Sequence, residues 1–205
     1  MKKILFLLLT AFIAVNIQAQ LNAEQKKIKQ TFFDFLAFYK KNEKKFNSFH
    51  LYKGQGKEYS PPFKIQWKEV EKYFAYLRKS VPYVGEAYIK AERKHFKDSE
   101  HYFKENPEEE IAVGFDYDRW AGGQESIEYT YKWYTSPKNK YIVEINRDTA
   151  VLKIGSELWE GAEEKDRVWN YVPFVKEKGK WKMADNILTM DTEEDAPPLI
   201  DETVK

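Results

Sequence analysis

The feature that most constrains the fold of this chain is a change in hydrophobic period near its middle. Up to about Glu110 the apolar residues recur at helical spacing, whereas beyond it they alternate with polar residues. A period of about 3.6 is typical of an amphipathic helix, and a period of two is typical of a strand with one buried face. We therefore expect an α+β domain, in which N-terminal helices pack on a curved antiparallel β-sheet.

Three helices are expected before the change of period. Asn22 followed by Gln25 resembles a capping box, which marks the start of the first helix. The second ends before Pro82, because proline restricts the preceding residue and lacks a backbone donor. Asn106-Pro107 ends the third. The helices are expected over residues 23–40, 67–80 and 85–105, and residues 41–66 are expected to form a loop with room for short strands.

A meander of antiparallel strands is expected in the second half. Ile127, Tyr129, Tyr131 and Trp133 alternate with polar residues, which predicts a strand with one buried face. Gly179 suits the turn of the last hairpin, because glycine readily takes the positive φ that such turns require. The strands are expected over residues 127–133, 141–146, 149–158, 167–176 and 181–187.

The first nineteen residues predict an export signal. Lys2 and Lys3 precede an apolar run over residues 4–15, and Ala19 stands at the expected cleavage point. The run is shorter than the roughly twenty residues that a spanning helix needs, so we expect cleavage after Ala19 and no membrane anchor. The protein is expected to be periplasmic or secreted. The chain has no cysteine, which excludes disulfides and a lipid attached through cysteine.

Composition indicates a folded domain with an aromatic interior. The chain has 14 Phe, 14 Tyr and 6 Trp, a load that suits a packed core or an aromatic cavity and excludes disorder of the whole chain. The net charge of +1 does not favour nucleic-acid binding. Residues 20–190 are expected to form a single domain. Residues 191–205, with six acids and one lysine, are expected to form an acidic flexible tail.

Charge is unevenly distributed along the chain. Residues 40–66 contain seven lysines and two glutamates, and residues 108–128 contain seven acids and one arginine. The plainer interpretation is that the two segments face each other or are solvated. The alternative is that the basic, aromatic segment meets an anionic partner, such as a cell-envelope polymer or an acidic protein.

The residues that close the expected sheet resemble a family pattern. After three helices and several strands, the chain reads Val172-Pro173-Phe174-Val175 and then Gly179-Lys180-Trp181-Lys182-Met183. This resembles the nuclear transport factor 2-like superfamily of cone-shaped domains, in which a terminal hairpin of this kind is common. The segment from Asp116 to Glu125 resembles the acidic stretch that exported bacterial members of unassigned function carry before their first long strand. Residues 80–85 leave little room for the short strand that the family usually has there.

The resemblance implies a conical pocket between sheet and helices, but no particular activity. The same fold hosts isomerases, dehydratases, small-ligand binders and protein-binding modules. In its pocket enzymes a carboxylate moves a proton within an apolar cavity. Asp116 and Asp118 are the candidates for that role, with Tyr129 or Tyr131 as donors. Alternatively, the Asp-Tyr-Asp sequence forms a turn that satisfies its own backbone and pairs with Arg119.

Aromatic side chains of the expected strands line a ligand pocket in one interpretation and form a plain core in the other. Trp181 belongs to this aromatic set. The candidate ligand-binding residues are Asp116, Asp118, Trp120, Gln124, Tyr129, Tyr131, Trp133, Trp169 and Tyr171. No metal site is expected, because His95, Asp98 and His101 spread over about 120° of a helix and converge only partly. The sequence lacks a glycine-rich phosphate loop, a nucleophile elbow and the protein-kinase motifs, which disfavours the corresponding enzyme classes. No cofactor is expected.

These observations favour an exported, non-catalytic domain that binds a small apolar ligand or an envelope protein. One alternative is a proton-transfer enzyme, similar to an isomerase or dehydratase, that uses a buried Asp116 or Asp118. The other is an envelope inhibitor or immunity-like interaction protein, which needs only a surface. The sequence leaves the formation of a homodimer open.

Overall fold

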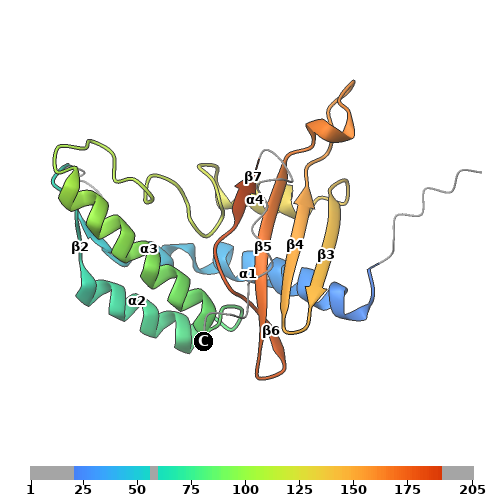
Figure 1. The fold of residues 1–205 in the computed structure, drawn as a ribbon, viewed down its shortest axis with the longest axis horizontal. Helices are drawn as coiled ribbons and strands as arrows, with labels where there is room; N and C mark the ends of the chain where they lie inside the picture. The colour runs from blue at the N-terminus through green and yellow to red at the C-terminus, as the bar shows by residue number, and fades with distance from the viewer. Residues whose placement is uncertain (1–20, 56–59, 191–205) are drawn as a thin grey trace, which may run out of the picture.

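A computed structural model describes residues 21–55 and 60–190 of the chain. The predicted export signal and the predicted acidic tail lie outside these residues. Figure 1 shows the helices and strands of the described part. The helices are α1 (Ala23–Phe46), α2 (Trp67–Ser80), α3 (Glu86–Glu105), α4 (Ile127–Tyr134) and a short 3-10 helix, Glu164–Asp166.

Two antiparallel sheets accompany the helices. The larger sheet has the order β3-β4-β5-β6, with β7 pairing to β5 beside β6, and the smaller one pairs β1 with β2. The strands are β1 (Tyr52–Lys53), β2 (Lys64–Ile65), β3 (Lys140–Asn146), β4 (Thr149–Gly155), β5 (Trp169–Glu177), β6 (Lys180–Met183) and β7 (Leu188–Met190).

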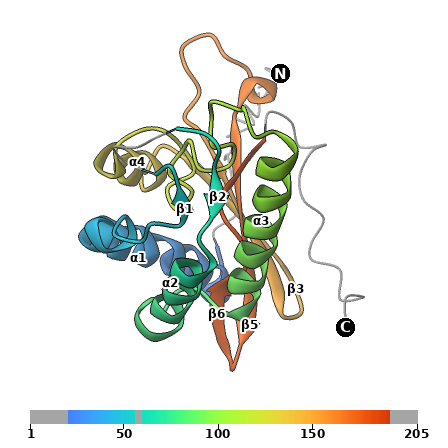
Figure 2. The same cartoon turned by 90° about the vertical axis from the view of Figure 1, so that its left-hand side faces the viewer.

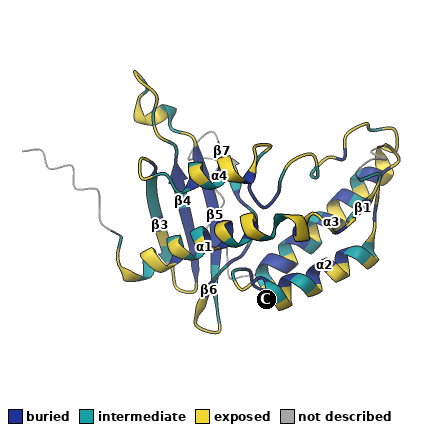
Figure 3. Ribbon diagram, turned by 180° about the vertical axis from the view of Figure 1, so that it is seen from behind, coloured by how far each residue is buried: buried dark blue, intermediate teal, exposed yellow. Residues whose placement is uncertain are grey.

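The N-terminal helices pack against a curved sheet, so the expected α+β class is confirmed. Helices α1 and α4 lie across one face of the large sheet, as the view from behind shows (Figure 3). Helices α2 and α3 stand beside the sheet, and the β1–β2 pair lies next to them (Figure 2). Buried side chains such as Leu152, Val172 and Phe174 join the sheet to the helices in one continuous core.

Helix α1 begins where the sequence predicts and ends later. Asn22 accepts hydrogen bonds from the backbone amides of Glu24 and Gln25, and the Gln25 side chain accepts one from the Asn22 amide, which completes the capping box. The predicted end near Lys40 is wrong, since the helix runs to Phe46. Tyr39 and Phe46 are seven positions apart on one face, and both are buried, with ring centres 4.9 Å apart. This packing continues the helix for another turn and a half.

The predicted strand over residues 127–133 is wrong, because this segment is helix α4. The Ser126 side chain caps the helix by accepting a hydrogen bond from the Tyr129 amide. The buried residues are Ile127, Thr130 and Tyr134, at helical spacing. Tyr129, which the alternation placed on the buried face, is 56% exposed. Tyrosine occurs on surfaces as well as in cores, so the alternation of Tyr129 with polar residues does not show that it is buried.

The predicted last strand over residues 181–187 is also wrong in part, because it is interrupted. Strand β6 ends at Met183 and β7 begins at Leu188. Between them, the Ala184 amide donates to the carbonyl of Pro173 at 2.9 Å, and the chain then leaves the ladder. This irregular stretch directs the Asn186 side chain toward α3, where it accepts from Tyr88 and donates to Glu92.

The connection between α2 and α3 contacts the sheet near Met183. Val84 forms an isolated parallel bridge with Met183, and the Met183 amide donates to the carbonyl of Tyr83 at 2.9 Å. The Glu177 carboxylate then accepts from the first amides of α3, from Glu86 at 3.2 Å and Ala87 at 3.1 Å. A Cβ atom at Gly85 would lie 2.3 Å from Glu177 Oε1, so a larger residue there would displace the Glu177 carboxylate from this position.

Candidate functional site

The candidate site is a pocket of about 330 Å³ that opens between the C-terminal end of α1, strand β1, helix α2 and the loop after α3. Most of its lining is aromatic or apolar, and the remaining side chains are polar or charged. We call this cavity the aromatic pocket. Its apolar lining consists of Phe46, Phe49, Leu51, Tyr52, Tyr73, Phe115, Tyr117 and Trp120. The polar lining consists of Glu43, Asn47, Gln55, Asp118, Arg119 and Glu125.

A tight turn at Asp118 places Trp120 in the aromatic pocket. Asp118 Oδ1 accepts from the amides of Trp120 at 2.9 Å and Ala121 at 3.0 Å, so the side chain organises the backbone that follows it. The Asp118 amide and carbonyl both bond to Gly123, which closes the turn. Asp118 Oδ2 accepts from the Tyr39 hydroxyl at 2.8 Å, which ties the turn to α1.

Trp120 forms an aromatic floor shared by three helices. Its ring stacks on Tyr88 of α3, with centres 5.1 Å apart and planes 13° apart. It meets Phe46 of α1 edge-on at 4.9 Å and Tyr73 of α2 at 5.7 Å. Such offset and edge-to-face pairs stabilise an aromatic cluster beyond simple burial. The floor of the aromatic pocket is therefore preformed.

A buried ion pair adjoins this floor. Arg119 and Glu92 are 8% and 2% exposed, and the Arg119 guanidinium donates to Glu92 Oε1. Burial is the largest single influence and would lower the pKa of Arg119, but the surrounding groups, with the Glu92 carboxylate foremost among them, together outweigh it, so the pKa is raised. The guanidinium lies 5.2 Å from the ring centres of both Phe96 and Phe115. Among the described residues, its Nε has no hydrogen-bond acceptor.

Three further side chains complete a buried polar cluster around Glu92. Tyr73 donates to Glu92 Oε2 at 3.2 Å, Asn186 donates to Glu92 Oε1 at 2.7 Å, and the Tyr88 hydroxyl donates to Asn186. Burial, and then the charge of Glu92, raise the pKa of both tyrosines well above the ordinary value. Both hydroxyls therefore stay protonated donors. The cluster joins α2, α3, the loop after α3 and the stretch before β7.

His95 contacts this region and makes stability depend on pH. Burial, and then the charge of Arg119, lower the pKa of His95 to about 4. An unfolded chain protonates its histidines near pH 6.5, so between that pH and about 4 the unfolded state binds more protons than the folded state. Stability is therefore expected to fall as the pH is lowered through this window.

The variant His95→Gln should flatten the dependence of the free energy of unfolding on pH between about 6.5 and 4. Urea unfolding at a series of pH values measures this slope. His101→Gln is the matched control on the same helix, because His101 is exposed and its Nε2 lies 3.3 Å from Glu105. A slope that His95→Gln leaves unchanged would contradict the expected role of His95.

The structure brings four of the predicted site residues to one region. Asp118 and Trp120 line the aromatic pocket. Asp116 is exposed, and together with Gln124 it lines a second hollow along the same loop, which Asp118 also borders. Asp118 is half-buried, and both of its oxygens accept hydrogen bonds. The prediction of a turn that satisfies its own backbone is therefore met at Asp118. Arg119, however, pairs with Glu92.

The other predicted site residues lie away from the aromatic pocket. Tyr129, Tyr131 and Trp133 belong to α4. Trp169 and Tyr171 pack with Val151 in a separate cluster. That cluster lies on the opposite face of the sheet, since Val172 and Phe174, which alternate with them along β5, pack in the main core.

Several residues of the buried cluster were not singled out from the sequence. These residues are Glu92, Tyr73, Tyr88 and Asn186. For Glu92 a signal existed, because it lies between Tyr88 and Phe96 at spacings of four on the buried face of α3. A glutamate on the buried face of a helix is rarely fully buried unless a partner pairs with it, so such a position indicates a partner. No comparable pattern marks Asn186.

The two oppositely charged segments noted in the sequence meet at the aromatic pocket. The basic segment supplies Phe46, Phe49 and Tyr52, and the acidic one supplies Phe115 and Trp120. Their contact is aromatic: the Tyr52 and Phe115 ring centres lie 4.9 Å apart. The expectation that the two segments face each other holds at this point.

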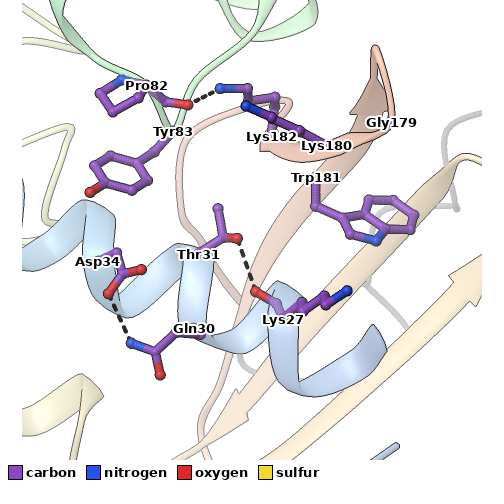
Figure 4. Close-up of a pocket in the computed structure, with 10 residues that line it drawn as sticks. All are labelled: Lys27, Gln30, Thr31, Asp34, Pro82, Tyr83, Gly179, Lys180, Trp181 and Lys182. Carbon is purple, nitrogen blue, oxygen red and sulfur yellow. Dashed lines mark hydrogen bonds between the residues drawn. The ribbon is translucent and has the colours of Figure 1, made fainter. Parts of the chain in front are cut away.

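A second hollow is a groove of about 530 Å³ between α1, the α2–α3 connection and the β5–β6 hairpin (Figure 4). Several of its polar groups are already engaged. Asp34 accepts from Gln30 at 2.8 Å, Thr31 donates to the Lys27 carbonyl, and Lys182 donates to the Pro82 carbonyl. The groove lacks the aromatic enclosure of the pocket, so the pocket is the stronger candidate.

Comparison with known proteins adds no relative. No protein-family model matches this chain, and no curated protein or solved structure is similar enough to count as a match. Within residues 21–55 and 60–190, none of the helices combines the length and the apolar character that crossing a membrane requires. In the same part of the chain, no three acidic or histidine side chains gather closely enough to hold a metal ion.

Proposed function

We propose that this protein is a non-catalytic binding domain that takes a small, largely apolar ligand in the aromatic pocket. The observation that carries the proposal is the preformed floor at Trp120, which rings from three helices hold in place beneath a concave, mostly aromatic lining. Concave apolar sites with a few placed polar groups are typical of small-molecule binding. The signal sequence predicted over residues 1–19 supports an exported location.

The carboxylates nearest the floor support binding better than catalysis. A proton-transfer residue needs a carboxyl that reaches the substrate and exchanges its proton. Asp118 instead uses both oxygens to hold its turn and Tyr39, and Glu92 is committed to Arg119, Tyr73 and Asn186. An inhibitor or immunity-like role needs no open pocket, so a cavity of about 330 Å³ favours the ligand-binding role over it.

Native mass spectrometry on the protein purified gently from its own host tests the proposal. We expect a mass excess of a few hundred daltons that disappears on denaturation. Tyr117→Ala should reduce the fraction of protein that retains the ligand, because Tyr117 is an exposed residue of the pocket lining. Tyr129→Ala is the matched control, since Tyr129 is also exposed but lies on α4 away from the pocket. A clean mass of the chain alone, or of the chain with a second protein, would contradict the proposal.

A further inference from the structure

We propose that the aromatic pocket selects a cationic ligand, an ammonium group carried on a small apolar body. This inference rests on the binding role proposed above and adds the chemical class of the ligand. It follows from the charges of the pocket, the faces of its rings and its size.

The charges that line the aromatic pocket are mostly negative. Among the residues that the structure describes, the lining contains three acids, Glu43, Asp118 and Glu125, and one basic residue, Arg119. The charge of Arg119 is matched by Glu92, with which it forms an ion pair. An entering ligand therefore meets an excess of carboxylates, which favours a cation and disfavours an anion.

The rings of the lining present faces that attract cations. An ammonium group over an aromatic face gains electrostatic energy from the negative charge density of the ring, and more when water is excluded. The same rings already contact cations of the chain: Lys45 Nζ lies 4.6 Å from the ring centre of Phe49, and the Arg119 guanidinium 5.2 Å from that of Phe115. Trp120, the ring type that attracts cations most strongly, forms the floor, with one of its faces stacked on Tyr88.

The size and shape of the aromatic pocket suit an alkylated ammonium group. Its volume of about 330 Å³ lies at the small end of the range for ligand sites, about 300–1,000 Å³. A quaternary ammonium has no N–H to donate, so it needs apolar contact and diffuse negative charge. An aromatic lining with carboxylates supplies both.

The test compares choline with 3,3-dimethylbutan-1-ol, a neutral molecule of the same shape, on the full mature chain. Each is titrated by NMR, and the indole N–H signal of Trp120 reports occupancy of the pocket. We expect choline to bind about tenfold more tightly than the alcohol, the selectivity that about 1.4 kcal/mol provides. Added salt should weaken the binding of choline and leave that of the alcohol unchanged.

Glu43→Gln tests the electrostatic origin of this selectivity. It should lower the affinity for choline severalfold and leave the affinity for the alcohol unchanged. Glu128→Gln is the matched control, because Glu128 is exposed on α4 and does not line the pocket. Equal affinities for the two probes would overturn the cationic preference and leave the binding role standing. Failure of both probes to shift the Trp120 signal would overturn the proposed binding role together with this inference.

Discussion

Replacing Glu92 with glutamine should lower the free energy of unfolding by about 3–5 kcal/mol. The substitution removes the charge that neutralises Arg119, whose side chain is almost completely buried between Phe96 and Phe115. Breaking a buried ion pair by removing one partner is strongly destabilising, because the other charge stays in a medium that solvates it poorly. The hydrogen bonds from Tyr73 and Asn186 to Glu92 weaken as well, since they lose a charged acceptor.

Urea unfolding of the variant and the wild type measures this loss. Glu71→Gln is the matched control: Glu71 also pairs with an arginine, Arg93, but on the surface, and an exposed pair contributes at most about 1 kcal/mol. The double variant Glu92→Leu with Arg119→Met should recover much of the loss, because it removes both buried charges at once. A Glu92→Gln variant as stable as Glu71→Gln would contradict the assigned role of the pair.

Replacing Trp120 with alanine should destabilise the protein by about 3–5 kcal/mol, the usual cost of removing a large aromatic side chain from a core. The deletion leaves Tyr88 without its stacking partner and Phe46 and Tyr73 without their edge contacts. It should also abolish ligand binding, because the floor of the aromatic pocket is lost.

Trp159→Ala is the control for the loss of a tryptophan as such. Trp159 is 62% exposed, so its removal should change stability by less than about 0.5 kcal/mol. Thermal unfolding followed by circular dichroism compares the two variants. Similar midpoints for both would show that Trp120 does not hold the pocket together.

Local sequence patterns predict much of this fold, and they fail where the structure depends on contacts between residues far apart in the sequence. The capping box at Asn22, the stop before Pro82 and the turn at Gly179 depend on neighbouring residues, and the structure has a helix start, a helix end and a turn there. Tyr129 shows the opposite case. Its alternation with polar residues indicated a strand, but the Ser126 cap and the burial of Ile127 and Tyr134 make the segment a helix.

The candidate site was predictable in part. The Asp118 turn is encoded locally, and with it the inward position of Trp120. The two-residue period of a strand shows that alternate residues share a face, but it does not show which face meets the helices. The assignment of Trp169 and Tyr171 to the ligand pocket is therefore wrong, because both pack on the opposite face of the sheet. The pairing of Glu92 with Arg119 joins positions 27 residues apart, and only the folded chain brings them together.

The divided pairing of β5 also affects the order in which the chain can fold during synthesis. Phe174–Glu177 finds its partner in β6 soon after translation, whereas Trp169–Tyr171 pairs with β7, whose residues end the described part of the chain. Synthesis adds about 5–20 residues per second, and folding proceeds from the N-terminus as the chain is made. Until Leu188–Met190 emerges, the first residues of β5 offer an open edge that other chains can bind. A chain shortened before Leu188 would keep that edge open permanently.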